Sequence, residues 1–155
     1  MRNRGRIFNF LVACVSIALS TIAAAETPIP ATRPMYFEHL TMRDGLSMST
    51  INSILQDSQG YVWLATEAGL NRYDGYTVRQ FRRDRGNPHG LASDYVWSIA
   101  EDAQGDIWLA TDGGGVARWE RHTESFQQFR HDPKQPRSLA SDTVRALLID
   151  SKGLI

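Results

Sequence analysis

Between about residue 50 and residue 130, apolar residues occur in short alternating runs, and turn-forming residues interrupt these runs every few positions. Alternation predicts short antiparallel β-strands, because successive side chains of a strand point to opposite faces of a sheet. In the later part of this stretch we predict strands over Val96 to Glu101, Asp106 to Thr111, Val116 to Trp119 and Phe126 to Arg130. Asp112 and the three glycines after it form one of the predicted turns, where a positive φ costs little.

The chain repeats itself, and Trp63 and Trp108 occupy one position in two copies that lie 45 residues apart. The shared positions of the first copy are Leu46, Ser53, Ile54, Asp57, Gln59, Gly60, Trp63, Leu64, Ala65, Thr66 and Gly69, which recur as Leu91, Ser98, Ile99, Asp102, Gln104, Gly105, Trp108, Leu109, Ala110, Thr111 and Gly114. A third copy then begins, and it repeats the start of the second at Leu139, Ala140, Ser141, Asp142, Val144, Asp150, Gly153 and Ile155. Such a fixed spacing indicates a repeat architecture.

A period in the mid-forties, with four short strands, one fixed aromatic residue and glycine-rich turns, is typical of β-propeller blades. We expect Trp63 and Trp108 to fill the space between adjacent blades, with Ile54 and Ile99 beside them. The predicted fold class is all-β, an incomplete β-propeller with two four-stranded antiparallel blades and the start of a third. The predicted blades span about residues 46–81, 91–130 and 139–155. Because the repeat breaks off inside its second strand, we expect an amino-terminal fragment of a longer protein.

The first 25 residues have the pattern of a secretory signal peptide. Arg2, Arg4 and Arg6 precede an apolar run, and cleavage is expected after Ala25, which leaves residues 26–36 as a linker. An uncleaved membrane anchor is the alternative, but the apolar run is short for a bilayer. The sole cysteine, Cys14, lies in this run and resembles a lipoprotein-processing site, although processing there would leave an apolar stretch at the new terminus. We therefore expect export to the bacterial periplasm.

Charge and chemistry narrow the possible functions further. The 17 Lys and Arg residues balance the 17 Asp and Glu residues, and removal of residues 1–25 leaves 14 against 17, so nucleic-acid binding is not expected. The histidines His39, His89, His122 and His131 match no metal-binding spacing. Asp57, Asp102 and Asp150 recur with glycine three residues later, as expected for side chains that cap turn amides. No nucleophile motif accompanies the serines, so we predict no catalysis, no cofactor and no metal site.

The run from Asp57 to Thr66, followed by Gly69 to Gly75, resembles the two-component regulator propeller repeat, and Asp102 to Thr111 is its second copy. The resemblance extends over residues 37–155, which would form a partial propeller of this family. The tryptophan-aspartate repeat needs a Trp-Asp pair that this chain lacks. The sialidase Asp-box places one residue between Asp and Gly, where this chain has two.

The resemblance implies a periplasmic, ligand-sensing propeller region of a transmembrane signal-transduction receptor anchored in the inner membrane. The output module of such a parent is a histidine kinase, often a hybrid, or a diguanylate cyclase. The implied partners are a periplasmic ligand, either a small molecule or a glycan, the remaining blades of the parent chain, and a second copy of the parent. The alternative is a secreted propeller that acts as a protein-interaction scaffold without signalling output. A secreted enzyme would need a polar catalytic cluster near the axis.

Blade geometry predicts where a ligand binds. Connectors between blades and the turns between second and third strands emerge on one face of a propeller, and loops on a rigid scaffold commonly carry binding residues. The ligand-binding candidates on this face are Arg82, Asn87, His89, Asp112 and Arg137. The repeat positions Asp57, Gly60, Trp63, Thr66, Gly69, Asp102, Gly105, Trp108, Thr111 and Gly114 are expected to be structural.

Overall fold

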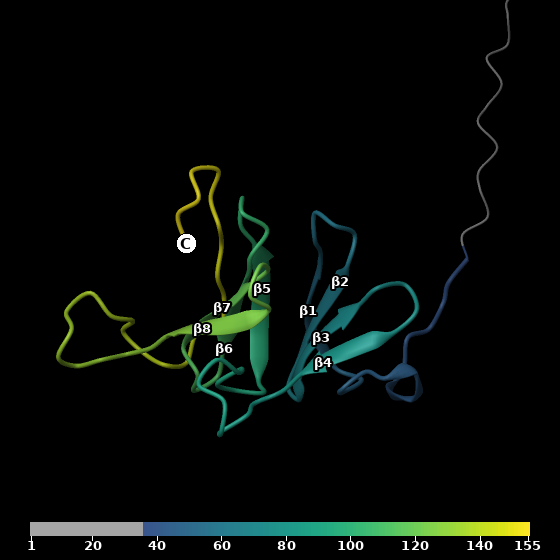
Figure 1. Ribbon diagram of the computed structural model, residues 1–155, viewed down its shortest axis with the longest axis horizontal. Helices are drawn as coiled ribbons and strands as arrows, with labels where there is room; N and C mark the ends of the chain where they lie inside the picture. Colours follow the sequence, from purple (N-terminus) through teal and green to yellow (C-terminus); the bar gives the residue numbers. More distant parts are fainter. Residues whose placement is uncertain (1–35) are drawn as a thin grey trace, which may run out of the picture. The chain divides into compact units, whose positions relative to one another are not determined.

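The computed structural model describes residues 36–155, in which two four-stranded antiparallel sheets follow the short 3₁₀ helix η1 (Met42–Asp44). The first sheet contains β1 (Ile51–Gln56), β2 (Val62–Thr66), β3 (Gly69–Tyr73) and β4 (Val78–Phe81). The second contains β5 (Val96–Glu101), β6 (Ile107–Thr111), β7 (Val116–Glu120) and β8 (Ser125–Phe129). In both sheets the strand order follows the chain (Figure 1). The predicted signal peptide and the linker up to residue 35 lie outside the described residues.

The predicted all-β fold with four strands per copy is confirmed, and each predicted strand agrees with an observed one to within a residue at either end. The sheets are the first and second blades below. The third copy forms no strand, although Gly153 N–H donates to the Asp150 carbonyl at 3.0 Å. Gly60 and Gly105 make the same bond to Asp57 and Asp102. The turn therefore forms from local bonds, whereas a strand needs a paired neighbour, which residues 143–149 lack among the described residues.

An aromatic cluster joins the two blades. Trp63 is fully buried, and its ring lies 4.9 Å from that of Trp119 and 5.7 Å from that of Phe81. Phe126 approaches Phe81 edge-on at 5.8 Å between ring centroids, and Ile99 belongs to the same cluster. Full burial of side chains of this size contributes about 2–3 kcal/mol each, so this cluster is the main source of cohesion between the blades.

The expectation that Ile54 lies beside Trp63 is wrong. In the register of β1 and β2, Trp63 pairs with Leu55, while Ile54 pairs with Leu64 and lies on the opposite face, where it is 66% exposed. The first strand of a blade therefore contacts the preceding blade and the tryptophan contacts the following one. Ile99 accordingly packs into the cluster of Trp63.

Trp108, the second repeat tryptophan, is only partly buried. Its ring stacks on Phe129 of its own blade at 5.3 Å, with 22° between the ring planes. The difference from Trp63 arises because a complete blade covers the face of Trp63, and only the strandless third copy adjoins the face of Trp108.

The turn between β2 and β3 corrects one detail of the repeat alignment. Thr66 Oγ1 donates to the Gly69 carbonyl at 2.7 Å, and Thr111 Oγ1 donates to the Gly115 carbonyl at 2.8 Å, so Gly115 and not Gly114 is the counterpart of Gly69. Both glycines have positive φ, and a Cβ would lie 2.5 Å from the Phe81 carbonyl oxygen at Gly69 and 2.1 Å from that of Phe129 at Gly115. The extra residue of the second copy lies before this required glycine.

The blades approach each other most closely at their first strands. The backbones of β1 and β2 lie against that of β5, while the fourth strands β4 and β8 meet only through side chains such as Phe81 and Phe126 (Figure 1). Strands β1 and β5 are therefore the inner edges of a fan, which is the arrangement of adjacent propeller blades. No helix among residues 36–155 has the length and apolar character needed to cross a bilayer.

Candidate functional site

An ion-paired joint links the first turn of one blade to the last turn of the next. Arg121, in the turn after β7, donates from Nη2 to Asp57 Oδ2 at 3.1 Å and to Glu101 Oε1 at 3.2 Å. Its Nε donates to the Gly105 carbonyl at 2.8 Å. Glu101 in turn accepts the Ser58 hydroxyl at 2.6 Å, so the joint crosses between the blades twice.

Asp57 is the centre of this joint, and its side chain is completely buried. Its Oδ1 accepts the backbone N–H groups of Gln59 and Tyr61, and its Oδ2 accepts the Trp63 indole N–H at 2.9 Å. Burial acts to raise the pKa of Asp57, but the bonds from Trp63, Arg121 and the two amides outweigh it and lower the pKa below its ordinary value. The amide capping predicted from the recurrence of this aspartate is confirmed.

Asp102 has the same role in the second blade. Its Oδ1 accepts from the amides of Gln104 and Asp106, and its Oδ2 accepts the Trp108 indole N–H at 2.7 Å. Asp150 caps the third turn through the amides of Lys152 and Leu154. The aspartates of the repeat therefore organise the turns of the blades.

A second contact between the blades involves Glu124, in the turn between β7 and β8. Its carboxylate accepts from Arg79 Nη1 at 2.8 Å and lies 3.7 Å from Arg72 Nη1. The hydrogen bond from Arg79 lowers the pKa of Glu124 below its ordinary value. Arg72 also lies over the rings of Tyr61 and Trp63, at 4.7 and 5.7 Å from the ring centroids, so it contributes to the aromatic cluster as well.

The connectors and the turns after β2 and β6 lie together, as blade geometry predicts. The Gly69 amide donates to the Asp94 carbonyl at 2.7 Å, and the Gly115 amide donates to the Asp142 carbonyl at the same distance. The residues that gather here form the loop face: Glu67, Ser93, Tyr95, Asp112 and Thr143. Tyr95 Oη donates to Glu67 at 2.9 Å, Thr143 Oγ1 donates to Asp112 Oδ1 at 3.0 Å, and Ser93 Oγ donates to the Asp112 carbonyl at 2.6 Å.

The phenol of Tyr95 stays protonated in this setting. Desolvation raises the pKa of Tyr95, and the hydrogen bond to Glu67 and the negative charges of Glu67 and Asp112 raise it further. The phenol is therefore a persistent hydrogen-bond donor on the loop face.

The five predicted ligand-binding residues do not form one cluster. Asp112 lies on the loop face, whereas Arg82 donates to Gln80 at 3.1 Å. Asn87 and His89 are adjacent, since Asn87 Oδ1 accepts the His89 amide at 2.9 Å. The His89 carbonyl accepts the backbone N–H of Phe126 at the start of β8. The connector between the blades therefore runs beside β8 before it reaches β5.

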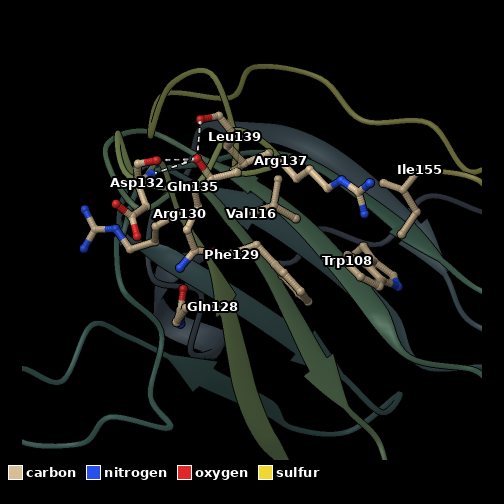
Figure 2. A pocket seen from close by; sticks show the side chains of 11 residues that line it. Trp108, Val116, Gln128, Phe129, Arg130, Asp132, Gln135, Arg137, Leu139 and Ile155 are labelled. Carbon is tan, nitrogen blue, oxygen red and sulfur yellow. Dashed lines mark hydrogen bonds between the residues drawn. The ribbon is translucent and has the colours of Figure 1, made fainter.

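Arg137 lines a cavity of about 550 Å³ beside the second blade. Figure 2 shows Trp108, Val116 and Phe129 on the sheet side of this cavity and Arg137 extending toward Ile155. The cavity lies on the face of Trp108 that only the third copy adjoins. We attribute it to blade packing, because the equivalent face of Trp63 is filled by the next blade.

One of the four histidines makes a side-chain bond that holds a connector. His131 Nδ1 lies 2.6 Å from the Leu139 carbonyl oxygen, a bond that fixes the third connector. Residues 36–155 contain no group of three or more His, Cys, Asp and Glu side chains arranged to hold a metal ion.

Sequence reasoning missed Arg121, Glu101 and Tyr95. Arg121 and Glu101 have no counterpart of the same type in the first copy, so they are not among the positions that the copies share. Tyr95 lies one residue before β5, between two positions that the copies share. Its own position is not shared, and this difference was the signal in the sequence that could have identified it.

Comparison with known proteins identifies the repeat. The family model described as two component regulator propeller matches residues 45–68 and 90–113, which cover the first two strands of each blade and the turn between them. These two segments match the two-component regulator propeller repeat.

Relatives of these repeats include histidine kinase P4 of Formosa agariphila, which is 40% identical over 57 residues, or 37% of this chain and 4% of that protein. A solved structure assigned as the extracellular domain of the hybrid two-component system BT3049 of B. thetaiotaomicron aligns with 75% of this chain at 28% identity and a TM-score of 0.70. The extracellular domain of BT4673, from the same organism, shares the fold, with 24% identity over 70% of this chain and a TM-score of 0.56. The chain spans only 16% and 14% of those two structures.

Proposed function

We propose that residues 37–155 are part of the ligand-sensing propeller region of a transmembrane receptor whose output module is a histidine kinase or a diguanylate cyclase. The observation that carries this proposal is the match to the extracellular domain of BT3049 over three quarters of the chain. The identity with histidine kinase P4 supports a kinase output in particular.

The proposed role of these blades is ligand binding at the loop face, with no catalysis. Tyr95, Glu67 and Asp112 offer a phenol and two carboxylates on turns held by the sheets. Such side chains can recognise a small polar ligand through hydrogen bonds. The two blades would transmit binding as a rigid unit through the joint of Arg121 and Asp57.

The proposed location is the periplasm. The basic start, the apolar run and Ala25 support export by a signal peptide, and the extracellular origin of the BT3049 structure agrees with it. The five residues predicted from blade geometry remain candidates for ligand contact, with Asp112 the best placed of them because it lies on the loop face.

The test is an output assay on the intact gene product in membrane vesicles. Phosphate incorporation from labelled ATP reports a kinase and formation of cyclic di-GMP from GTP reports a cyclase, each measured with and without fractions of small molecules and glycans. The proposal predicts one of these activities and a change on addition of a fraction. Absence of both activities would instead favour the secreted interaction scaffold, for which a stable protein complex is expected.

A further inference from the structure

The cations of the chain are concentrated in the connectors that follow β4 and β8, residues 82–90 and 130–138. These two segments hold six Lys and Arg residues against two Asp residues, whereas the rest of residues 36–155 holds seven cationic residues against 14 acidic ones. The connectors therefore carry a formal charge of +4, and the remainder of the described chain carries −7. Opposite charges are thus separated in space on a chain that is neutral overall.

The two connectors have the same backbone hydrogen bonds. After β4, the Asn87 amide donates to the Asp84 carbonyl at 3.3 Å, and the Gly90 amide donates to the Asn87 carbonyl at 3.0 Å. After β8, the Gln135 amide donates to the Asp132 carbonyl at 2.9 Å, in the position that corresponds to the first of these bonds. Each connector is therefore a chain of turns that holds its side chains on a fixed loop.

The acidic residues of the connectors bind backbone amides and form no ion pair with the cations beside them. Asp84 Oδ1 accepts the Gly86 N–H at 2.9 Å, and Asp132 Oδ1 accepts the Lys134 N–H at the same distance. Three exposed cationic side chains make no hydrogen bond or ion pair with any residue that the structure describes, those of Arg83, Arg85 and Lys134. The fold uses the acids of these loops and leaves their cations to face solvent.

The two connectors meet at the outer edge of β8. The His89 carbonyl accepts the Phe126 N–H at 2.8 Å, and Gln128 Nε2 donates to the Gly90 carbonyl at 2.8 Å, so the connector after β4 lies along this strand. The other connector begins directly after β8 and extends away from the sheets (Figure 1). Their cations form the basic rim: Arg82, Arg83, Arg85, Arg130, Lys134 and Arg137.

The composition of the rim indicates what kind of partner it fits. Residues 82–90 and 130–138 contain no Leu, Ile, Val, Met, Phe, Tyr or Trp. A stable interface between folded proteins has an apolar core in which aromatic residues are common, and these loops offer none. The headgroup layer of an anionic bilayer needs no such core, because it attracts clustered Lys and Arg residues by charge. The basic rim therefore fits a lipid surface better than it fits a protein.

We propose that the basic rim docks on the anionic phospholipid headgroups of the membrane that anchors the receptor; the presence of that membrane rests on the proposed function. The guanidinium groups of Arg83 and Arg85 would donate paired N–H groups to lipid phosphates, and Lys134 would act as a point charge. Docking would restrict how far the two blades can move from the bilayer.

The test measures how fast phenylglyoxal labels individual arginines of the intact gene product in the presence of lipid nanodiscs. One set of discs contains phosphatidylcholine alone, and the other also contains about 30% phosphatidylglycerol, which supplies negative charge. Headgroup contact covers a guanidinium, so Arg83 and Arg85 should be labelled about fivefold more slowly with the anionic discs. Arg145, an exposed arginine outside the rim, should be labelled equally with both. Salt at about 0.5 M should remove the protection, because it screens exposed charges.

Lys134→Glu reverses one charge of the rim and should remove most of the protection of Arg83 and Arg85. Lys152→Glu is the matched control. Lys152 is also an exposed lysine two residues after a turn aspartate, and it too bonds to that aspartate through its backbone N–H. The control should keep the protection of the wild type.

The inference is overturned if Arg83 and Arg85 are labelled equally fast with both kinds of disc, or if the two lysine variants behave alike. Protection that appears only when a periplasmic protein fraction is added would overturn it in favour of a protein partner.

The output assay separates the two proposals. Kinase or cyclase output from a protein whose rim arginines are labelled equally with both kinds of disc would refute docking and leave the sensor function standing. Protection by anionic discs in a protein without either output would support docking and refute the sensor function.

Discussion

Arg121 in the last turn of the second blade donates to Asp57 in the first turn of the first blade, over 3.1 Å and across 64 positions of sequence. The same carboxylate accepts from the repeat tryptophan Trp63. The buried carboxylate of Asp57 thus bonds both to Trp63, which recurs in the repeat, and to Arg121, which occurs in one copy only. The adhesion of the two blades depends on both.

Arg121→Ala should destabilise the purified protein by about 3 kcal/mol, because the buried carboxylate of Asp57 would lose its cationic partner. The midpoint of urea unfolding measures this. Arg85→Ala removes an exposed arginine of the connector and should change stability by no more than about 0.5 kcal/mol. Equal effects of the two variants would show that the joint does not hold the blades together.

Acid should weaken the joint. The pKa of Asp57 is lowered in the folded protein, so its contribution to stability is complete above the unfolded pKa of about 3.9 and is lost as the pH falls through the folded value. Asp57→Asn should therefore reduce the loss of stability between about pH 5 and pH 2, measured by urea unfolding at each pH. A variant with the same pH dependence as the wild type would assign acid sensitivity to other carboxylates, such as Glu124 and Asp142.

Gly115→Ala should cost about 3 kcal/mol or more, because the added Cβ would lie 2.1 Å from the Phe129 carbonyl oxygen and the residue has a φ of +74°. Gly113→Ala is the matched control. Its φ is +72°, but no atom lies within 4 Å of an added Cβ, so only the conformational cost of about 1 kcal/mol applies. Equal losses, measured as shifts of the denaturation midpoint, would contradict the close approach of backbone seen at Gly115.

Export can be tested with alkaline phosphatase, which is active only outside the cytoplasm, fused after residue 155. The fusion should be active, and deletion of residues 2–25 should abolish the activity. Cys14→Ser should leave export and cleavage unchanged. A loss of processing in that variant would establish the lipoprotein alternative instead.

The repeat spacing, the four strands of each of the first two copies and the capped turns could all be predicted from the sequence. Strand alternation, a turn aspartate with glycine three residues later and a fixed tryptophan are local signals, because their partners lie within about six positions of each other, as Asp57 and Trp63 do. The position of the glycine turn was predicted to within one residue. Gly114 and Gly115 look alike in sequence, but of the two only Gly115 has a positive φ and approaches the Phe129 carbonyl.

The burial of Trp63 between the blades was predicted, but the other contacts between blades could not be predicted in this way. Whether Ile54 or Leu55 faces the tryptophan depends on the register of β1 with β2, and the alternation of a strand does not reveal which face a neighbour will cover. The partners of Arg121 depend on how two sheets pack, and the contact between the rings of Tyr95 and Trp97 depends on the bulge that turns a side chain out of the ladder. The repeat in the sequence therefore determined the strands and turns of each blade. The packing of one blade on the next determined which of the residues that the copies do not share come into contact.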